Sequence, residues 1–275
     1  MTGLGRQRRA RVLTALGYLA AGYAMLVPAA SARPADGQVS RGGAVFSDAG
    51  LGGAGRSSAD RMGTVSRNRN RPNYAFAGYL TTQSGSMTVK VRFKVPKFVC
   101  TKKERAISPG AFLLSGPSDS EVFSAANIIL GCFKGHPVTE EVLVINNVER
   151  NAHRPLHAGD TVVARVTDRP AGSTTVEVQV TGKGHHFALR DTGMGTAPDA
   201  ELLGDWASVD LSTGRPVLPP RFAPTTFRSG KVDGKPFGSL KPTGYRMVRP
   251  SHGLQISTGR FFGTPKDNFV CRRPR

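Results

Sequence analysis

The sequence predicts an all-β protein whose antiparallel strands form a sandwich or a barrel. From Met87 to Val95 every odd position is apolar, whereas the even positions are Thr, Lys, Arg and Lys. Such alternation is typical of a strand with one buried face and one face in water. Many short apolar segments follow, separated by turns rich in the chain's 33 glycines and 19 prolines, and none has helical periodicity. About 200 residues of this pattern are compatible with one domain.

The first 32 residues have the organisation of a signal peptide. A basic n-region precedes an apolar run from Val12 to Val27, and the small residues Ala30-Ser31-Ala32 follow. The arginines of the n-region are Arg6, Arg8, Arg9 and Arg11. We expect cleavage after Ala32 and a secreted protein with no transmembrane span, for which the cell wall is one candidate location. The Arg8-Arg9 pair leaves both the Sec and the twin-arginine export routes open. An uncleaved membrane anchor is the alternative, but the run is short for a span.

Residues 33–72 are predicted to be a disordered linker, and residues 73–275 a compact, monomeric domain. The linker is rich in Gly, Ser, Ala and Arg and has almost no large apolar side chains. Such a segment buries too little apolar surface to offset the entropy lost on ordering.

The chain is strongly basic, with a formal charge of +19. Removal of the four leader arginines leaves +15. A basic surface favours anionic partners, such as anionic cell-wall polymers, acidic glycans or lipid headgroups. The basic residues are spread along the predicted strands, and no nucleic-acid motif interleaves them with aromatic residues. Specific nucleic-acid recognition is therefore not expected.

Further strands are predicted in order along the chain. Residues 173–181 alternate strictly, and residues 186–191 are expected to pair back on them. The other expected strands are 111–115, 122–130, 141–146, 161–167, 202–211, 222–227, 245–248, 253–257 and 269–271.

Three cysteines are present, at positions 100, 132 and 271. Export makes a disulfide plausible, and the positions after two apolar strands favour the pair Cys100–Cys132, with Cys271 left free. The closed loop of about thirty residues corresponds to roughly 3 kcal/mol in the chain-entropy model. No Cys-x-x-Cys motif, histidine pair at ligand spacing or glycine-rich phosphate loop occurs. Neither a metal nor a cofactor is expected.

Several motifs occur in the order found in the glutamic peptidase (eqolisin) family. Ala75-Phe-Ala-Gly-Tyr79 is similar to the family's Asn-Trp-Ala-Gly-Tyr, and Phe93-Lys-Val-Pro96 to its Trp-x-Val-Pro. Gly131-Cys-Phe-Lys-Gly135 resembles the Gly-Cys-x-x-Gly of bacterial secreted relatives. The resemblance covers roughly residues 73–270. It implies a concanavalin A-like, jelly-roll sandwich of two large antiparallel sheets.

The family's catalytic glutamine and glutamate are not found at the matching positions, which are Ile129 and Val209. In the family, the glutamate acts on water as general base and acid, and the glutamine stabilises the oxyanion. Neither an isoleucine nor a valine can do this chemistry. A one-residue slip would bring Asp210 near the glutamate position, but on the opposite face of the strand unless a bulge intervenes. Asp205, on the other side of Trp206, is a second fallback candidate.

The resemblance therefore predicts a secreted, catalytically silent relative of the glutamic peptidases. It would bind an anionic cell-wall polymer, a glycan or a peptide through its basic face or through a groove lined by Phe76, Tyr79 and Trp206. Core packing is the alternative role for these three aromatic residues. The alternative function is an active acid peptidase or glycan hydrolase that uses relocated carboxylates, Asp205 and Asp210.

Overall fold

The computed structural model describes residues 70–82, 88–101, 105–115, 122–169, 171–194, 200–208, 217–249 and 251–274. The predicted signal peptide and residues 33–69 of the predicted linker lie outside these ranges. Within them the protein is all-β, as expected, with one short 3₁₀ helix, η1 (Phe237–Leu240). No helix in this part of the chain is both long and apolar enough to cross a membrane.

The first sheet has the strand order β8-β7-β6-β5-β12-β2-β16 and is antiparallel throughout, except that the short β1 pairs in parallel with β16. Its strands are β1 (Arg71–Asn73), β2 (Phe76–Thr81), β5 (Arg105–Ser115), β6 (Val122–Phe133), β7 (His136–Ile145), β8 (Val148–Pro155), β12 (Ala200–Ala207) and β16 (Thr243–Arg249).

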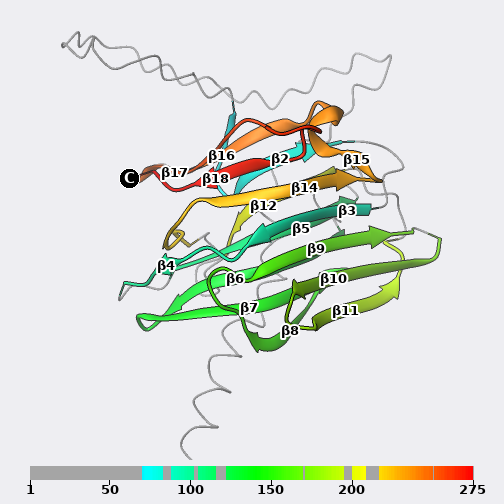
Figure 1. The fold of residues 1–275 in the computed structure, drawn as a ribbon, viewed down its shortest axis with the longest axis horizontal. Helices are drawn as coiled ribbons and strands as arrows, with labels where there is room; N and C mark the ends of the chain where they lie inside the picture. Colours follow the sequence, from blue (N-terminus) through cyan, green and yellow to red (C-terminus); the bar gives the residue numbers. More distant parts are fainter. Residues whose placement is uncertain are drawn as a thin grey trace, which may run out of the picture. The chain divides into compact units, whose positions relative to one another are not determined.

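The second sheet has the order β11-β10-β9-β3-β14-β18-β17, and β17 also pairs with β16 of the first sheet, which joins the two sheets along one side (Figure 1). Its strands are β3 (Thr88–Lys94), β9 (Thr161–Asp168), β10 (Ser173–Thr181), β11 (His185–Thr192), β14 (Thr225–Val232), β15 (Lys235–Pro236), β17 (Gly253–Thr258) and β18 (Phe269–Arg272). A separate ribbon pairs β4 (Phe98–Val99) with β13 (Arg221–Phe222).

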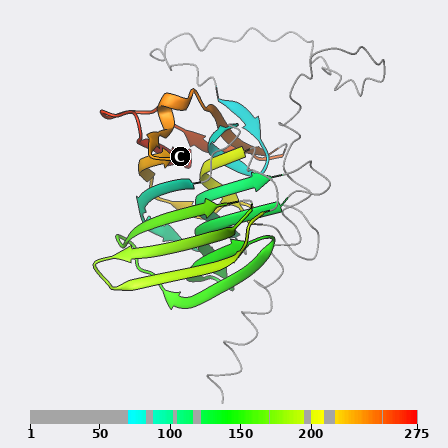
Figure 2. The same cartoon turned by 90° about the vertical axis from the view of Figure 1, so that its right-hand side faces the viewer.

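The main core lies between the two sheets, which are seen as layers in Figure 2. The alternation that predicted β3 is confirmed, because Val89, Val91 and Phe93 are buried while the intervening Lys90, Arg92 and Lys94 are exposed. The strict alternation of β10 likewise buries Thr174 and the three valines that follow it at every second position. Across the core, β6 packs on β9 and β10, and β5 packs on β3.

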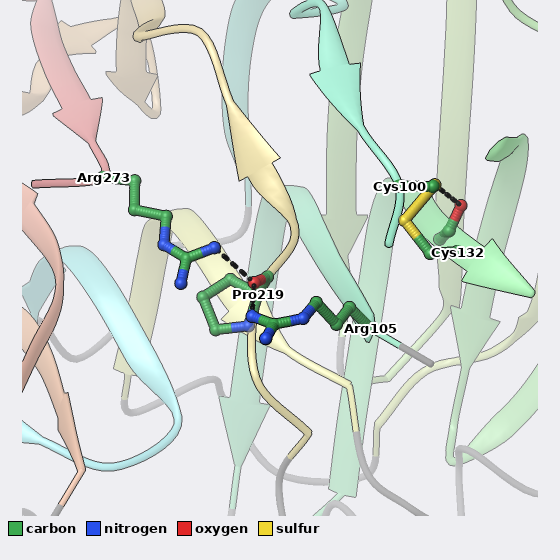
Figure 3. The surroundings of a disulfide bond; sticks show 6 residues. Cys100, Arg105, Cys132, Pro219 and Arg273 are labelled. Carbon is green, nitrogen blue, oxygen red and sulfur yellow. Dashed lines mark hydrogen bonds between the residues drawn. A yellow bond between two sulfur atoms is a disulfide. The ribbon is translucent and has the colours of Figure 1, made fainter. Parts of the chain in front are cut away.

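The predicted disulfide is confirmed. Cys100 and Cys132 are bonded, with their Cα atoms 5.3 Å apart (Figure 3). Cys132 lies near the end of β6, and Cys100 follows β4. Cys271, on β18, is a free, buried thiol.

Candidate functional site

The face of the first sheet that points away from the main core carries a second apolar cluster, which we call the outer cluster. At its centre, the Trp206 ring lies 5.5 to 5.7 Å from the rings of Phe76, Phe112 and Phe123, measured between centroids. Ile129 of β6 also belongs to this cluster. Because strand residues alternate between faces, each of the strands β2, β5, β6 and β12 contributes to both clusters.

A narrow pocket lies in the outer cluster. Its non-atom space of about 230 Å³ includes open solvent, and between the side chains it is too tight to hold a water molecule. Its polar lining residues are Ser108, Asn127 and Glu149, from β5, β6 and β8. Its apolar lining residues are Phe112, Phe123, Ile129, Val142 and Val144. We call it the outer pocket.

The strand register explains why the polar residues meet there. Asn127 lies opposite Val142 of β7, which lies opposite Asn151 of β8. Glu149 lies opposite Val144, one step along the same face. With about 4.8 Å between strands and 3.4 Å per residue, the Cα atoms of Asn127 and Glu149 are roughly 12 Å apart. From this separation the two side chains converge on the same narrow pocket.

A tight turn places Glu149 on this face. Asn146 and Asn147, between β7 and β8, have left-handed backbone conformations, with φ of 50° and 66°. Two such residues make the type of turn whose twist suits a two-residue hairpin loop. The Asn147 backbone N–H donates to Phe123 O (2.9 Å), and its side-chain Oδ1 accepts from Phe123 N (2.8 Å). The turn is therefore held against the start of β6.

Burial dominates the electrostatics of Glu149. It raises the pKa of this carboxyl to about 7, although the nearby side-chain amide of Asn151 opposes the shift; the negative charge of Glu140 adds to it. Glu140 lies on β7 opposite Ile129 and shares its face of the sheet. Glu149 thus holds its proton up to neutral pH, and the charge of Glu140, which does not line the pocket, acts on it from farther along β7.

The polar atoms of the outer pocket are poorly satisfied by the protein. Within the described ranges, Ser108 Oγ, Asn127 Oδ1 and both carboxyl oxygens of Glu149 are buried without a hydrogen bond of good geometry. Buried polar groups are nearly always hydrogen-bonded in native proteins, and exceptions cluster at functional sites. These polar atoms would be available to a ligand only if the side chains around the narrow pocket moved apart.

Among the residues predicted from the family motifs, Ile129 lies in the wall of the outer pocket, whereas Val209 and Asp210 fall outside the described residues. Asp205 lies on β12 but faces the main core, where it is 1% exposed and adjacent to Cys271. Burial raises the pKa of Asp205 to about 7 against a smaller opposing effect of the thiol. The structure therefore does not bring Asp205 to the outer pocket.

The three aromatic residues predicted to line a groove are divided between the two faces. Phe76 and Trp206 belong to the outer cluster, next to the pocket. Tyr79 lies in the main core, where its ring is 4.1 Å from that of Phe261 and its hydroxyl donates to Gly259 O (2.8 Å).

No pattern in the sequence singles out Asn127, Glu140 or Glu149 as functional residues. Val148–Pro155 has no apolar alternation, so β8 was not predicted from its composition. The Asn146-Asn147 pair after the apolar run of β7 is the pattern that could have predicted a hairpin and a further strand. No group of three or more metal-ligating side chains occurs in the ranges that the structure describes.

Together, the fold and the pocket define a two-sheet antiparallel sandwich with carboxyl and amide groups in an aromatic-walled pocket on one sheet. Among solved structures, the chain is similar to scytalido-glutamic peptidase bound to a transition state analog inhibitor, with a TM-score of 0.60, 12% identity and coverage of 73% of this chain and 98% of that chain. It is also similar to SCP-B, a member of the eqolisin family in complex with the tripeptide Ala-Ile-His, with a TM-score of 0.57, 11% identity and the same coverages.

These similarities confirm the fold relationship with the glutamic peptidases that the motifs suggested. No family model matches the sequence. No curated protein matches it either.

Proposed function

We propose that the protein is a hydrolase that cleaves peptide bonds under acidic conditions, using the carboxyl of Glu149 in the outer pocket together with that of Glu140 on the same face of the sheet. The observation that carries the proposal is Glu149, a carboxyl with a pKa of about 7 that lines one pocket with the Asn127 amide. The fold shared with peptidases that bind a transition state analog or a tripeptide supports a peptide as the substrate.

The chemistry follows from the protonation states. Below pH 7 Glu149 carries a proton that it can give to the leaving nitrogen as the C–N bond breaks. The Glu140 carboxyl would accept a proton from the water that attacks the carbonyl carbon. The donor to the oxyanion that forms would be the Nδ2 amide group of Asn127, because its unpartnered Oδ1 can only accept a hydrogen bond. Two carboxyl groups with divided acid and base roles are a recurring solution in hydrolases.

The test is cleavage of denatured casein between pH 3 and 8 by the purified protein. We expect Glu149→Gln to lower the rate by a factor on the order of 10²–10⁴. Asn127→Ala should lower it by about 10²–10³. Glu177→Gln, a matched change in a half-exposed residue on β10, should keep the wild-type rate. An unchanged rate in Glu149→Gln would refute the assignment, and loss of activity in Asp205→Asn alone would instead favour the carboxylates flanking Trp206.

A second candidate function is peptide binding without turnover, as a catalytically silent relative of the glutamic peptidases. The apolar Ile129 at the position of the family's glutamine favours it, as does the narrowness of the pocket. Binding of a short peptide that is weakened by Glu149→Gln, with no cleavage of casein or of a β-linked glycan at any pH, would support this function. Cleavage of the glycan alone would indicate a glycan hydrolase.

We also propose that the protein is exported and acts outside the cell as a monomer. The Cys100–Cys132 disulfide is compatible with an oxidising compartment. Amino-terminal sequencing of the mature protein should start at residue 33, and a chain that retains its first residues would contradict cleavage after Ala32.

A further inference from the structure

A cluster of three arginines lies near the disulfide, since Arg105 is paired with Cys132 across β5 and β6. Arg105 begins β5, Arg221 begins β13, and Arg273 follows β18. The side chains of Arg105 and Arg273 reach from opposite sides toward the backbone carbonyl of Pro219 (Figure 3). Three segments distant in the sequence therefore bring positive charge to one place.

The distances show how close the charges are. Arg105 donates to Pro219 O at 3.2 Å, and Arg273 donates to the same oxygen at 2.9 Å. The two donor nitrogens are thus no farther apart than the sum of these distances, about 6 Å. Arg221 is only two residues from Pro219, and its charge acts on Arg273. Burial, followed by the charges of Arg105 and Arg221, lowers the pKa of the Arg273 guanidinium.

Such an arrangement is unfavourable without an anion. Like charges at this separation repel, and more strongly where water is partly excluded. A carbonyl oxygen carries only a partial negative charge, and none of the three arginines forms an ion pair with a described residue. Each guanidinium has five N–H donors, of which the Pro219 carbonyl uses one apiece from Arg105 and Arg273. The Arg105 Nε is moreover buried without a partner in the described part of the chain.

We propose that Arg105, Arg221 and Arg273 form a binding site for a tetrahedral oxyanion, a phosphate or sulfate group. Guanidinium groups bind such oxygens through paired N–H donors, and arginine suits this geometry better than lysine does. Three positive charges match a doubly charged group better than a single carboxylate. The phosphate group could be a free ion or part of an anionic polymer. The strongly basic charge of the chain also favours binding of such a polymer. The site is independent of the proposed hydrolase activity.

The alternative role for these arginines is purely structural, as anchors for the segment around Pro219. Arg221 separates the two roles because no hydrogen bond joins its side chain to the Pro219 carbonyl. Arg221→Gln should therefore weaken an anion site while leaving both anchoring hydrogen bonds in place. Arg92→Gln, which removes the same charge from an exposed position on β3, is the matched control.

The experiment is isothermal titration of the full-length mature protein with inorganic phosphate, sulfate and acetate at low ionic strength, paired with thermal unfolding. We expect one phosphate or sulfate per chain, at least tenfold weaker binding of acetate, and at least tenfold weaker phosphate binding in Arg221→Gln and Arg273→Gln but not in Arg92→Gln. Phosphate should raise the wild-type Tm, and Arg221→Gln should lose this increase.

Equal effects of Arg92→Gln and Arg221→Gln would overturn the proposal, since they would indicate general screening of a basic surface. No phosphate binding by wild-type protein would also overturn it and leave the anchoring role. A glycerol-phosphate polymer that competes with phosphate only when Arg221 is present would identify polymer-borne phosphate as the natural source. A polymer that does not compete would leave the free ion as the ligand.

Discussion

Replacing Asp205 with asparagine should change how the stability of the protein depends on pH. The Asp205 carboxyl is 1% exposed in the main core, and burial raises its pKa from 3.8 to about 7. Neither of its oxygens has a hydrogen bond of good geometry to a described residue. The folded state therefore favours the neutral, protonated form. Asparagine has nearly the same shape and stays neutral at every pH.

The size of the effect follows from linkage between proton binding and folding. A shift of about three pKa units corresponds to about 4 kcal/mol. Because the folded-state pKa is raised, protonated Asp205 adds to the free energy of unfolding fully below pH 4. This stabilisation is lost as the pH rises to 7. The free energy of unfolding of Asp205→Asn should therefore be close to that of wild type at pH 4. At pH 7.5 the variant should be the more stable protein, by up to about 4 kcal/mol.

Urea unfolding of both proteins at half-unit steps between pH 4 and 8 measures the difference between their free energies of unfolding. The titration of all other groups affects both proteins equally and cancels in this difference. Asp160→Asn is a control of opposite sign. Burial tends to raise the pKa of Asp160, but hydrogen bonds from Lys183 (2.7 Å) and from the His157 backbone N–H (2.8 Å) outweigh it and lower the pKa. Asp160→Asn should be destabilised above pH 4 and approach wild type as the pH falls below that value. If the free energies of unfolding of wild type and Asp205→Asn differ by the same amount at every pH from 4 to 8, the reasoning is refuted.

Three further outcomes are expected. Removing the disulfide with paired serine substitutions at Cys100 and Cys132 should lower the free energy of unfolding by about 3–4 kcal/mol, because the bond closes a loop of 32 residues; unchanged urea midpoints would contradict this. Trp206→Ala should cost about 3–5 kcal/mol by the same measurement, since the ring packs on three phenylalanines, and a loss under 1 kcal/mol would mean that the outer cluster is loosely packed. Asn147→Ala should cost on the order of 1–3 kcal/mol through its strained φ of 66° and a lost hydrogen bond, whereas Asn147→Gly should cost less; equal costs would exclude the backbone contribution.

The sequence allowed prediction of those parts of the fold in which burial imposes a two-residue period. β3 and β10 have one face in the core and one in water, so their alternation is visible in the residues. β6 was recognisable as apolar, but its sequence does not show that it is buried on both faces, because a continuous apolar run has no period. The outer cluster lies on that second face, and no pattern in the sequence predicts it.

The candidate site was harder to predict for a related reason. Glu149 lies on β8, whose polar residues give no strand pattern, and its pKa depends on burial by other strands. Asp205 presents the reverse case. The sequence indicates Asp205 as a candidate because it is next to Trp206. Neighbours along a strand point to opposite faces, however, and Trp206 faces the outer cluster. Proximity in the chain and proximity in the site are therefore different properties in a sheet protein.

The burial of Cys271 bears on how the chain reaches its oxidised form. Three thiols can be joined in three ways, and two of these would trap a wrong product. Cys271 is wholly buried in the finished structure, and burial followed by the charge of Asp205 raises the pKa of its thiol, so little reactive thiolate forms. Once β18 has packed into the core, only Cys100 and Cys132 remain able to form a disulfide. An alkylating reagent should accordingly label one cysteine per chain in urea and none in native buffer.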